Sequence, residues 1–469
     1  MRPRILCQLH RPVPIIPQNE GASVNIDPAI FKAYDIRGIY PTQLNEPIAY
    51  ALGRAFVTFL NARTVILGRD MRLSGPSLFA AVSDGIRAQG ADVIAIGMVS
   101  TDQFYFACSR LGHPGMMVTA SHNPKEYNGF KMVKQMPYLL SGDEGIQDLR
   151  RLVEEEAFPP ASRQGTVQAL DLLDEFVSWL LTLIDPAVLR PLTVVADAAN
   201  GTVGPALLKL YRHLPVRLIP LCFEPDGSLP NHGLDPLQPE NRRDLEHRVV
   251  QEGADVGFAF DGDGDRFFVI DDRGKFVPGD FVTALLARQV LQKYPGAPIV
   301  YDVRSSWAVP DTIRAAGGVP IVERVGHAFI KRRMAEVNAA FAGEVSGHYY
   351  FREFNFADSG LIPSLFILDL LSRSGQRFSE LLAPFEQRYF VSGEINSRVA
   401  DVQAKLREVE ARYCDGQIEH LDGLSVSYPD WHFNLRPSNT EPLLRLNLEA
   451  RSRELLEAKR DELLALIRS

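Results

Sequence analysis

The sequence predicts an α/β protein with three similar α/β domains and one smaller C-terminal α+β domain. Two observations lead to this prediction. A pattern of apolar strand, helix and second apolar strand occurs three times, and the residues after about position 388 follow a different pattern. At 469 residues, the chain is long enough for about three domains of ordinary size or four smaller ones.

The repeated unit is clearest in its strands. Each first strand is a short apolar run that ends in polar residues: TVILGRD (64–70), LTVVADAANG (192–201) and PIVYDVRSS (298–306). Each is followed by a helical pattern and a second apolar run: ADVIAIG (91–97), VRLIPL (216–221) and VPIVERVG (319–326). This order predicts parallel βαβ crossovers with buried strands. Because α/β sheets bind ligands at the carboxyl ends of their strands, the polar residues there are candidates for binding.

The two ends of the chain differ from the repeats. After about residue 388, the helical stretch in EINSRVADVQAKLREVEARY precedes short strand-like runs and a closing helix, RELLEAKRDELLALIRS. The first 29 residues contain several prolines and little periodicity, and polar residues interrupt any signal-peptide core. The predicted organisation is a flexible extension (1–29), three α/β domains (30–168, 169–275 and 276–387) and a tail domain (388–469).

Composition limits the class of partner. Hydrophobic residues make up 46% of the chain and charged residues 23%, as in ordinary proteins with packed cores. The net charge of −8 argues against nucleic acid or an anionic membrane as a partner. No apolar run reaches the roughly 18 residues that a membrane helix needs. A small anionic substrate stays possible where basic residues gather.

Cysteine spacing indicates the compartment. The four cysteines (Cys7, Cys108, Cys222 and Cys414) lie far apart, and none forms a C-x-x-C pair. This spacing argues against a zinc site and against a disulfide framework, and it is typical of a reducing cytoplasm. We therefore expect a cytoplasmic protein.

The segment VGFAFDGDGDRFFVI places Asp261, Asp263 and Asp265 at alternate positions between two strand-like runs. Gly262 and Gly264 let the backbone curl so that the three carboxylates can converge on one point. Three like charges between apolar strands repel one another unless a cation is present. Oxygen ligands without His or Cys favour Mg²⁺, which also takes phosphate oxygens or water.

Three other interpretations of the acidic segment explain it less well. A solvated acidic turn would not explain why the carboxylates lie between apolar strands. An EF-hand requires glycine at the sixth position, where this chain has Arg266. A haloacid-dehalogenase-type phosphatase fits more closely, but it expects Thr or Ser where this chain has Asp265.

The segment TASHNP places Ser121 beside His122 and Asn123, and ends at Pro124. A serine hydrolase normally takes its base from elsewhere in the fold and sets its serine in G-x-S-x-G. Neither feature is evident here. Adjacent residues of an extended segment also point to opposite sides, so the pair is not expected to form a catalytic dyad.

Together, these segments resemble the α-D-phosphohexomutase superfamily, most closely its bacterial phosphomannomutase/phosphoglucomutase branch. The resemblance runs from about Phe31 to the C-terminus. It rests on FKAYDIRG (31–38), TASHNPKEYNGFK (119–131), DGDGDR (261–266), GEVSGH (343–348) and RPSNTEP (436–442). These segments are similar to the family's N-terminal, phosphoserine, metal, sugar and phosphate-binding segments, in that order. The resemblance implies four domains with mixed sheets around a central cleft.

The resemblance also implies the roles of individual residues. Ser121 would carry a phosphoryl group, and Lys131, Arg37 and His348 would assist its transfer. Ser121, Asp261, Asp263 and Asp265 would bind Mg²⁺. Substrate contacts would come from Tyr34, His122, Asn123, Arg266, Arg304, His327, Glu344, Ser346, Arg436, Ser438, Asn439 and Thr440. For Arg266 a salt bridge within its own loop, for His327 and His348 a purely structural role, and for RPSNT an ordinary turn stay open as alternatives.

The function implied is a phosphohexomutase that interconverts hexose 1-phosphates and 6-phosphates, of mannose and of glucose. A hexose 1,6-bisphosphate would be both intermediate and activator, and a monomer is expected. A metal-dependent phosphosugar phosphatase and a non-catalytic sugar-phosphate binding protein are the alternatives. Release of free phosphate would favour the first of these, and absence of phosphate on Ser121 the second.

Overall fold

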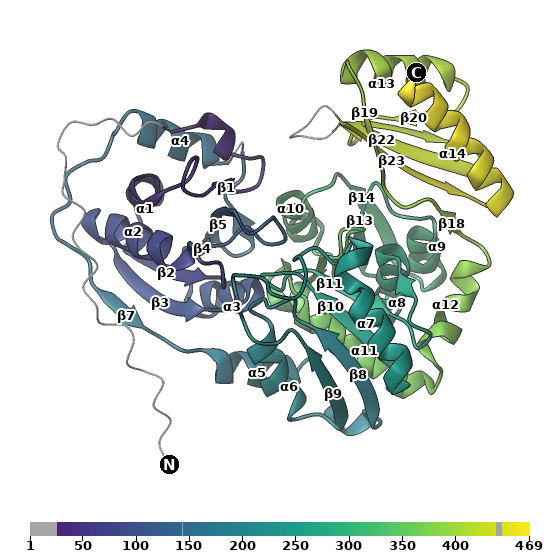
Figure 1. Ribbon diagram of the computed structural model, residues 1–469, viewed down its shortest axis with the longest axis horizontal. Helices are drawn as coiled ribbons and strands as arrows, with labels where there is room; N and C mark the ends of the chain where they lie inside the picture. Colours follow the sequence, from purple (N-terminus) through teal and green to yellow (C-terminus); the bar gives the residue numbers. More distant parts are fainter. Residues whose placement is uncertain (1–25, 143, 438–442) are drawn as a thin grey trace.

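The computed structural model describes residues 26–142, 144–437 and 443–469. Within these residues the chain forms four sheets, of seven, five, five and six strands, which follow one another along the sequence. Figure 1 shows the first sheet and its helices on one side, the next two units at the centre, and the C-terminal unit set apart above them. This arrangement confirms three α/β units followed by an α+β unit.

The first sheet is mixed, with strand order β1-β5-β4-β2-β3-β7, and β6 pairs with β5. Its strands are β1 (Ile36–Ile39), β2 (Thr64–Arg69), β3 (Asp92–Met98), β4 (Gly115–Val118), β5 (Tyr127–Gln135), β6 (Tyr138–Leu139) and β7 (Val167–Ala169). Its helices are α1 (Glu46–Leu60), α2 (Gly75–Ala88), α3 (Thr101–Leu111) and α4 (Ile146–Glu154).

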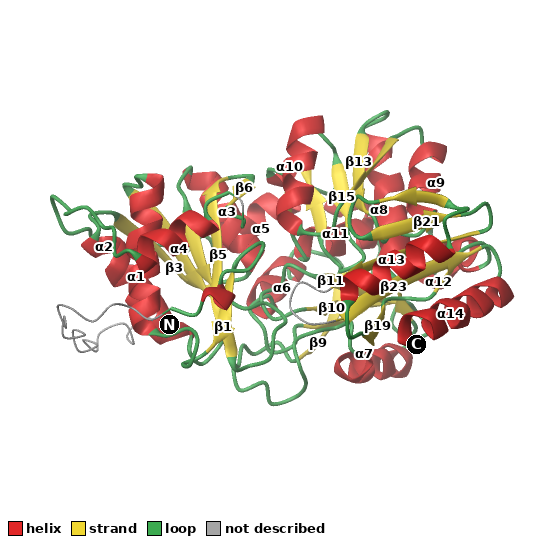
Figure 2. Ribbon diagram, turned by 90° about the horizontal axis from the view of Figure 1, so that it is seen from above, coloured by secondary structure: helices red, strands yellow, loops and turns green. Residues whose placement is uncertain are grey.

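Alternation along β2 and β4 explains how this sheet is covered on both faces. Val65 and Met116 pack in the core that contains α1, α2 and α4, whereas Ile66 and Met117 pack in the core that contains α3. Successive side chains of a strand point to opposite faces, so apolar residues at consecutive positions require helices on both sides. Figure 2 shows this unit side by side with the rest of the molecule.

The second sheet has the order β12-β11-β10-β8-β9. Its strands are β8 (Leu192–Asp197), β9 (Val216–Leu221), β10 (Val256–Phe260), β11 (Phe267–Ile270) and β12 (Phe276–Val277). Its helices are α5 (Leu173–Leu181), α6 (Gly204–Tyr211) and α7 (Pro239–Glu252).

The third sheet has the order β14-β13-β15-β16-β17. Its strands are β13 (Pro298–Asp302), β14 (Val319–Glu323), β15 (Phe341–Gly343), β16 (Tyr349–Phe351) and β17 (Ala357–Asp358). Its helices are α8 (Gly279–Lys293), α9 (Ala308–Ala315), α10 (His327–Val337), α11 (Leu361–Ser374) and α12 (Phe378–Glu386). The strand pairs β2–β3, β8–β9 and β13–β14 are all parallel, which confirms the three predicted crossovers.

The C-terminal sheet is antiparallel, with the order β18-β23-β22-β21-β20, and β19 pairs with β23. Its strands are β18 (Phe390–Val391), β19 (Ile395–Arg398), β20 (Gln417–Glu419), β21 (Leu424–Ser427), β22 (Trp431–Pro437) and β23 (Leu443–Ala450). Its helices, α13 (Val402–Arg412) and α14 (Arg453–Arg468), share a separate apolar core with the sheet.

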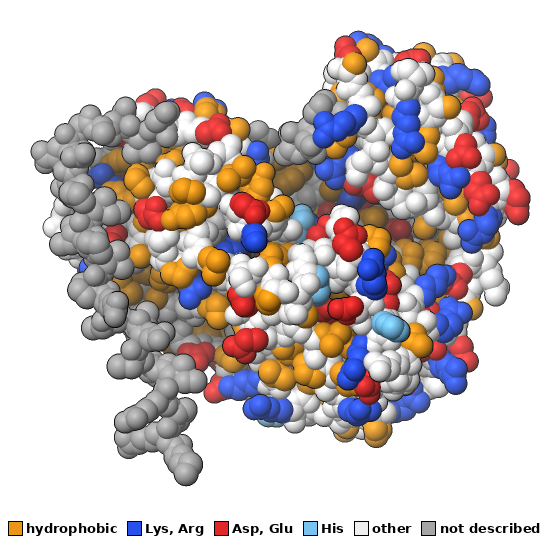
Figure 3. Space-filling view, viewed as in Figure 1, with side chains coloured by type: hydrophobic (Ala, Val, Ile, Leu, Met, Phe, Trp, Pro, Cys, Tyr) orange, Lys and Arg blue, Asp and Glu red, His pale blue; other side chains and the backbone are white. Residues whose placement is uncertain are grey.

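The cores explain which units are joined firmly. One apolar cluster runs through the second and third units and includes α3 of the first, whereas the C-terminal unit has a core of its own. Polar contacts attach the C-terminal unit to the third: the carboxylate of Glu449 accepts from the Ser306 hydroxyl at 2.8 Å and from the Trp307 backbone N–H at 2.7 Å. The molecule is deeply notched between its first and C-terminal units (Figure 3). No helix in the described part of the chain is long and apolar enough to cross a membrane.

Candidate active site

Ser121 lies in the loop that joins β4 to β5, residues 119–126, which we call the serine loop. The residue is 2% exposed, and its Oγ donates a hydrogen bond of 2.6 Å to Oδ2 of Asp261. Its backbone is left-handed, with φ of 49°. Non-glycine residues pay on the order of 1–3 kcal/mol for such backbone, and residues of this kind cluster at functional sites. The fold therefore presents a strained, buried hydroxyl to the acidic segment.

The left-handed turn corrects one expectation. Ser121 and His122 do not point to opposite sides, because Ser121 is not extended: its Oγ lies 3.2 Å from Nδ1 of His122. Burial, and then the charges of Arg266 and Arg37, hold the pKa of His122 well below its usual value, so the imidazole is neutral. The serine hydroxyl is nevertheless directed to Asp261, the shorter contact.

A buried arginine, which sequence reasoning missed, supports the serine loop through its backbone carbonyls. Arg72 is 2% exposed and its side chain pairs with Asp70 at 3.2 Å. Its guanidinium donates to the backbone carbonyls of Ser121, Asn123, Pro124 and Tyr127, at 2.7–2.9 Å. A planar fork with several donors suits this task better than an ammonium does. Nothing in the local sequence DMRLS distinguishes this arginine from a surface one.

Arg72→Lys is expected to lower kcat roughly 10- to 100-fold with little change in KM, because charged hydrogen bonds to the loop are lost at about 1.5–3 kcal/mol each. A lysine keeps the charge but cannot reach four carbonyls at once. Arg69→Lys is the matched control, since Arg69 contacts only the Asp70 carbonyl among the hydrogen bonds described for it. The rate of Ser121 phosphorylation, followed by mass spectrometry, separates loop positioning from global destabilisation. Wild-type kinetics in Arg72→Lys would contradict this role.

The acidic loop, residues 261–266, joins β10 to β11 and brings its three aspartates together as predicted. One oxygen from each carboxylate lies within 4.8 Å of the others, and all three residues are buried. Gly264 has a φ of 75°, which glycine tolerates. Gly262 serves a different purpose: a Cβ there would lie 2.8 Å from the carbonyl oxygen of Ser121. The second glycine curls the loop and the first permits its approach to the serine loop.

Lys131 lies on β5 and its Nζ lies between two of these carboxylates. It pairs with Oδ2 of Asp263 at 2.8 Å and with Asp265. Burial lowers the pKa of Lys131, but Asp263 and Asp265 outweigh it and raise the pKa above its usual value. Burial and the two neighbouring carboxylates also raise the pKa of Asp261. The ammonium of Lys131 therefore neutralises only part of the negative charge of the three carboxylates in the acidic loop.

The donor set fits a hard divalent cation. Oδ1 of Asp263 is buried and has no hydrogen-bond partner, although buried carboxylate oxygens normally have one. Oδ2 of the same residue already accepts from the hydroxyls of Thr101 (2.7 Å) and Thr119 (3.1 Å). Ser121 Oγ is within hydrogen-bonding distance of Asp261, so an oxygen on that serine could join three carboxylates around Mg²⁺.

Two arginines flank the serine loop. Arg37, on β1, pairs with Asp35 at 2.8 Å and donates to the Ala120 carbonyl at 3.3 Å and to the Asn123 side chain. Arg266 lies 3.9 Å from Asp261, so the salt bridge within its own loop is loose. Both guanidiniums lie close enough to the loop to meet an anion there.

The loop after β15, residues 344–348, lies against the acidic loop. His348 Nε2 lies 3.5 Å from Asp265 and its Nδ1 lies 3.0 Å from the Ser346 hydroxyl. Glu344 is buried; it accepts from the Gly326 backbone N–H at 3.1 Å and from the Tyr350 hydroxyl. The family resemblance implies that Glu344 contacts the substrate. In this structure both its oxygens already contact the protein.

Tyr34 and His327 meet at the border of the first and third units. Their rings are 5.7 Å apart, edge to face, and the tyrosine hydroxyl donates to the Val325 carbonyl at 3.0 Å. Burial raises the pKa of Tyr34 to about 12. Burial, then Lys331 and Lys131, hold the pKa of His327 well below its usual value. His327 Nδ1 is buried without a hydrogen-bond partner, so this neutral imidazole can accept one from a ligand.

Three arginines gather around Glu394 where the third and C-terminal units meet. Arg304 follows β13 and forks onto Asp302, and its other nitrogen lies 3.6 Å from Glu394. Arg436 and Arg445 lie 3.5 and 2.9 Å from the same carboxylate. Sequence reasoning missed Glu394. Ser438, Asn439 and Thr440, the other predicted members of this site, lie outside the described residues.

The structure brings together the serine loop, the acidic loop, Lys131, Arg37, Arg266 and His348. It also reveals a second buried pair in contact with this group: Lys331 and Asp358, 2.8 Å apart, and both 1% exposed. Oxygens of Asp358 and Asp265 and a nitrogen of His348 lie within 4.8 Å of one another. No sequence motif marks this pair, because its partners come from a helix and a short edge strand of the third unit.

Four family models match the chain in order. They describe phosphoglucomutase/phosphomannomutase α/β/α domains I, II and III, at residues 28–159, 174–274 and 278–389, and the C-terminal domain, at 394–466. The chain belongs to this family.

Individual relatives match nearly the whole length of this chain. A phosphomannomutase of Salmonella montevideo is 43% identical over 450 residues, which cover 94% of this chain and 99% of the relative. Phosphohexose mutases of Xanthomonas campestris pv. campestris are 42% identical over 442 residues, or 93% and 99% of the two chains. The crystal structure of a family protein from Burkholderia thailandensis matches with a TM-score of 0.86 at 36% identity, over 94% and 98% of the chains.

Proposed function

We propose that this protein is a phosphohexomutase that interconverts the 1-phosphates and 6-phosphates of mannose and glucose. The observation that best supports this proposal is the contact of the Ser121 hydroxyl with Asp261, 2.6 Å apart at a cluster of three buried aspartates. Family membership and curated relatives named as phosphomannomutase and phosphohexose mutases support the same reaction.

Ser121 is the proposed carrier of the phosphoryl group. Its Oγ–P bond would break as a new O–P bond forms to the free hydroxyl of the hexose phosphate, giving a hexose 1,6-bisphosphate. The bisphosphate would then reorient in the site, and its other phosphate would be transferred to Ser121. This second transfer leaves the isomeric monophosphate. Phosphoryl transfer asks a protein mainly for positioning and charge stabilisation. A rigid loop supported by Arg72 suits the first need and the surrounding cations suit the second.

Asp261, Asp263 and Asp265, with an oxygen on Ser121, would hold Mg²⁺. The bound ion would neutralise negative charge on the transferring group. Metal ligation would also satisfy the unpaired oxygen of Asp263.

Lys131 and Arg37 are proposed to stabilise charge at the reacting hydroxyl. The carboxylates beside Lys131 raise its pKa, which favours an ammonium that stabilises charge over an amine that removes a proton. His348 is the proposed proton carrier, since its ring nitrogens lie near Asp265 and Glu344. A proton taken from the sugar hydroxyl in one half-reaction would be returned in the other.

The remaining predicted residues are proposed to bind substrate. Sugar contacts would come from Glu344 and Ser346, with Tyr34, His122, Asn123 and His327 around them. Phosphate contacts would come from Arg266, Arg304 and Arg436, with Ser438, Asn439 and Thr440. Glu394 now pairs with Arg304 and Arg436, so an incoming phosphate would compete with it for two guanidiniums. The protein is proposed to act on these small phosphosugars as a cytoplasmic monomer, without nucleic acid or membrane.

Glu344→Ala should raise KM for glucose 1-phosphate and mannose 1-phosphate by a similar factor, roughly 10- to 150-fold, for lost hydrogen bonds of about 1.5–3 kcal/mol. The two sugars share O3 and O4 and differ at C2, so a group that contacts O3 and O4 cannot distinguish them. Tyr350→Phe is the control, because it removes a protein contact of Glu344 and leaves the carboxylate. A change confined to one sugar would contradict this assignment.

A coupled assay tests the proposed function. Purified protein with Mg²⁺ and a trace of hexose 1,6-bisphosphate is given glucose 1-phosphate or mannose 1-phosphate, and both 6-phosphate and inorganic phosphate are measured. We expect hexose 6-phosphate with almost no inorganic phosphate. Stoichiometric release of inorganic phosphate would overturn the proposal in favour of a phosphatase.

A further inference from the structure

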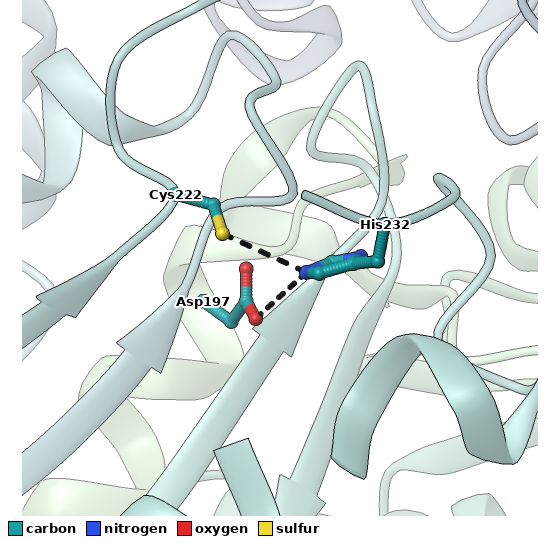
Figure 4. A group of neighbouring side chains, drawn as sticks. All are labelled: Asp197, Cys222 and His232. Carbon is teal, nitrogen blue, oxygen red and sulfur yellow. Dashed lines mark hydrogen bonds and ion pairs between the residues drawn. The ribbon is translucent and has the colours of Figure 1, made fainter. Parts of the chain in front are cut away.

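Asp197, Cys222 and His232 form a cluster of three different donors in the second unit (Figure 4). Asp197 ends β8, Cys222 directly follows β9, and His232 comes from the loop before α7. The carboxylate lies 3.0 Å and the thiol 3.7 Å from the same ring nitrogen, Nε2 of His232. All three donor atoms lie within 4.8 Å of one another.

The other ring nitrogen fixes the tautomer. Nδ1 of His232 lies 2.8 Å from the carbonyl oxygen of Gly233, which can only accept, so Nδ1 carries a proton. In a neutral ring, Nε2 then presents a lone pair to a carboxylate and a thiol. A histidine that ligates a metal has this arrangement, with its second N–H donated to a backbone carbonyl or carboxylate.

We propose that Asp197, Cys222 and His232 bind a zinc-type divalent transition-metal ion, at a site separate from the acidic loop. In a tetrahedral zinc site with bonds of about 2.0–2.3 Å, neighbouring ligand atoms lie about 3.3–3.8 Å apart. The separations of Nε2 of His232 from the Asp197 carboxylate and the Cys222 thiol, 3.0 and 3.7 Å, lie within a few tenths of an ångström of this range. On binding, the protons of the thiol and of Nε2 leave to solvent.

The ligand chemistry separates the two sites. Thiolate, a soft donor, and imidazole favour zinc-type ions, whereas three carboxylates favour Mg²⁺. Asp197 is paired with Ala259 where β8 and β10 run side by side, and Ala259 lies two residues before Asp261. The proposed site therefore lies at the same sheet edge as the acidic loop but uses none of its ligands.

The surroundings suggest what the ion would do. His232 lines a groove of about 750 Å³ that is also lined by residues 122–126 of the serine loop. Water in this open groove could supply a fourth ligand. Leu234, two residues after His232, also lines the groove, and a Cβ on Gly262 would lie 3.0 Å from its side chain. A metal at His232 would therefore fix the loop that borders both the serine and the acidic loops.

The rival arrangement is a simple ion pair. Burial lowers the pKa of His232, but hydrogen bonds with Asp197 and Cys222 outweigh it and raise the value to about 11. An imidazolium can therefore hold the cluster together without a metal. The sequence does not predict a zinc site here, because Cys222 has no nearby cysteine and only the fold brings it to Asp197.

Cobalt titration distinguishes the two arrangements. The full-length protein is stripped with chelator, exchanged into buffer with excess Mg²⁺, and titrated with Co²⁺, which gives a thiolate-to-cobalt band in the near ultraviolet. We expect the band to saturate at about one equivalent and to disappear when Zn²⁺ displaces Co²⁺. Cys222→Ser should abolish the band, and His232→Ala should weaken Co²⁺ binding at least about 100-fold.

Matched variants make the test specific. Cys414→Ser removes an exposed thiol of the C-terminal unit and should keep the band, and so should Asp263→Asn. Stoichiometric Zn²⁺ should raise the Tm of the wild type and leave that of His232→Ala unchanged. No band and no Tm shift in the wild type, or an undiminished band in Cys222→Ser, would overturn the proposal and leave the ion pair.

Discussion

Ser121→Ala is expected to lower kcat at least about 10³-fold, as loss of a nucleophile does elsewhere, with little change in affinity for hexose phosphate. The serine Oγ is the atom proposed to carry phosphate, and alanine removes only that atom. Steady-state assays give kcat, and calorimetry gives substrate affinity. Intact-mass spectra of the wild type should show one phosphate, and peptide spectra should locate it on Ser121.

His122→Ala is the matched control for this variant. Its neutral imidazole contacts Ser121 Oγ at 3.2 Å but is not proposed as a nucleophile or base. We expect a far smaller loss of kcat than in Ser121→Ala. Equal losses in the two variants would indicate a serine–histidine dyad, and an unphosphorylated Ser121 in fully active protein would contradict the relay.

Removing the metal is expected to have an effect of similar size. Treatment with EDTA should abolish turnover, and Mg²⁺ should restore it. Asp263→Asn should lower both Mg²⁺ affinity and kcat by at least about 100-fold, since one of three charged ligands is lost from a buried site. The amide keeps the shape of the side chain and can still accept from Thr101 and Thr119.

Thermal unfolding measures metal binding independently of activity. An ion that binds only the folded state stabilises it by RT ln(1 + [L]/Kd), so Mg²⁺ at about 100 Kd contributes about 2.7 kcal/mol. The wild type should gain a higher Tm with Mg²⁺, and Asp263→Asn should not. Asp271→Asn is the control, because Asp271 is buried in the neighbouring turn and pairs with Arg273. Full activity of metal-free protein would contradict the metal's role.

The strand patterns predicted the fold well because buried parallel strands leave a strong signal. The apolar runs at 64–70, 192–201 and 298–306 became β2, β8 and β13, each paired in parallel with the next predicted run. Convergence of the acidic loop was predictable too, since alternate aspartates separated by glycines have few ways to pack between strands.

What sequence could not predict depends on contacts between distant segments. The left-handed backbone at Ser121 turned its Oγ toward His122, against an expectation drawn from extended geometry. Arg72 contacts the serine loop although the two lie about fifty positions apart in the chain, and its local sequence is no different from that around a surface arginine. Glu394 and Cys222 are similar cases: each joins its partners only after separate units or strands are packed.

Transfer of labelled phosphate from the enzyme is the measurement that tests the proposed relay most directly. The protein is phosphorylated on Ser121 with ³²P from labelled bisphosphate, freed of small molecules, and mixed with unlabelled glucose 1-phosphate for a single turnover. If Ser121 passes its phosphate to O6 and recovers the one from O1, the label should appear in glucose 6-phosphate while the enzyme stays phosphorylated. Label in inorganic phosphate, or label that remains on Ser121 while product forms, would contradict the relay.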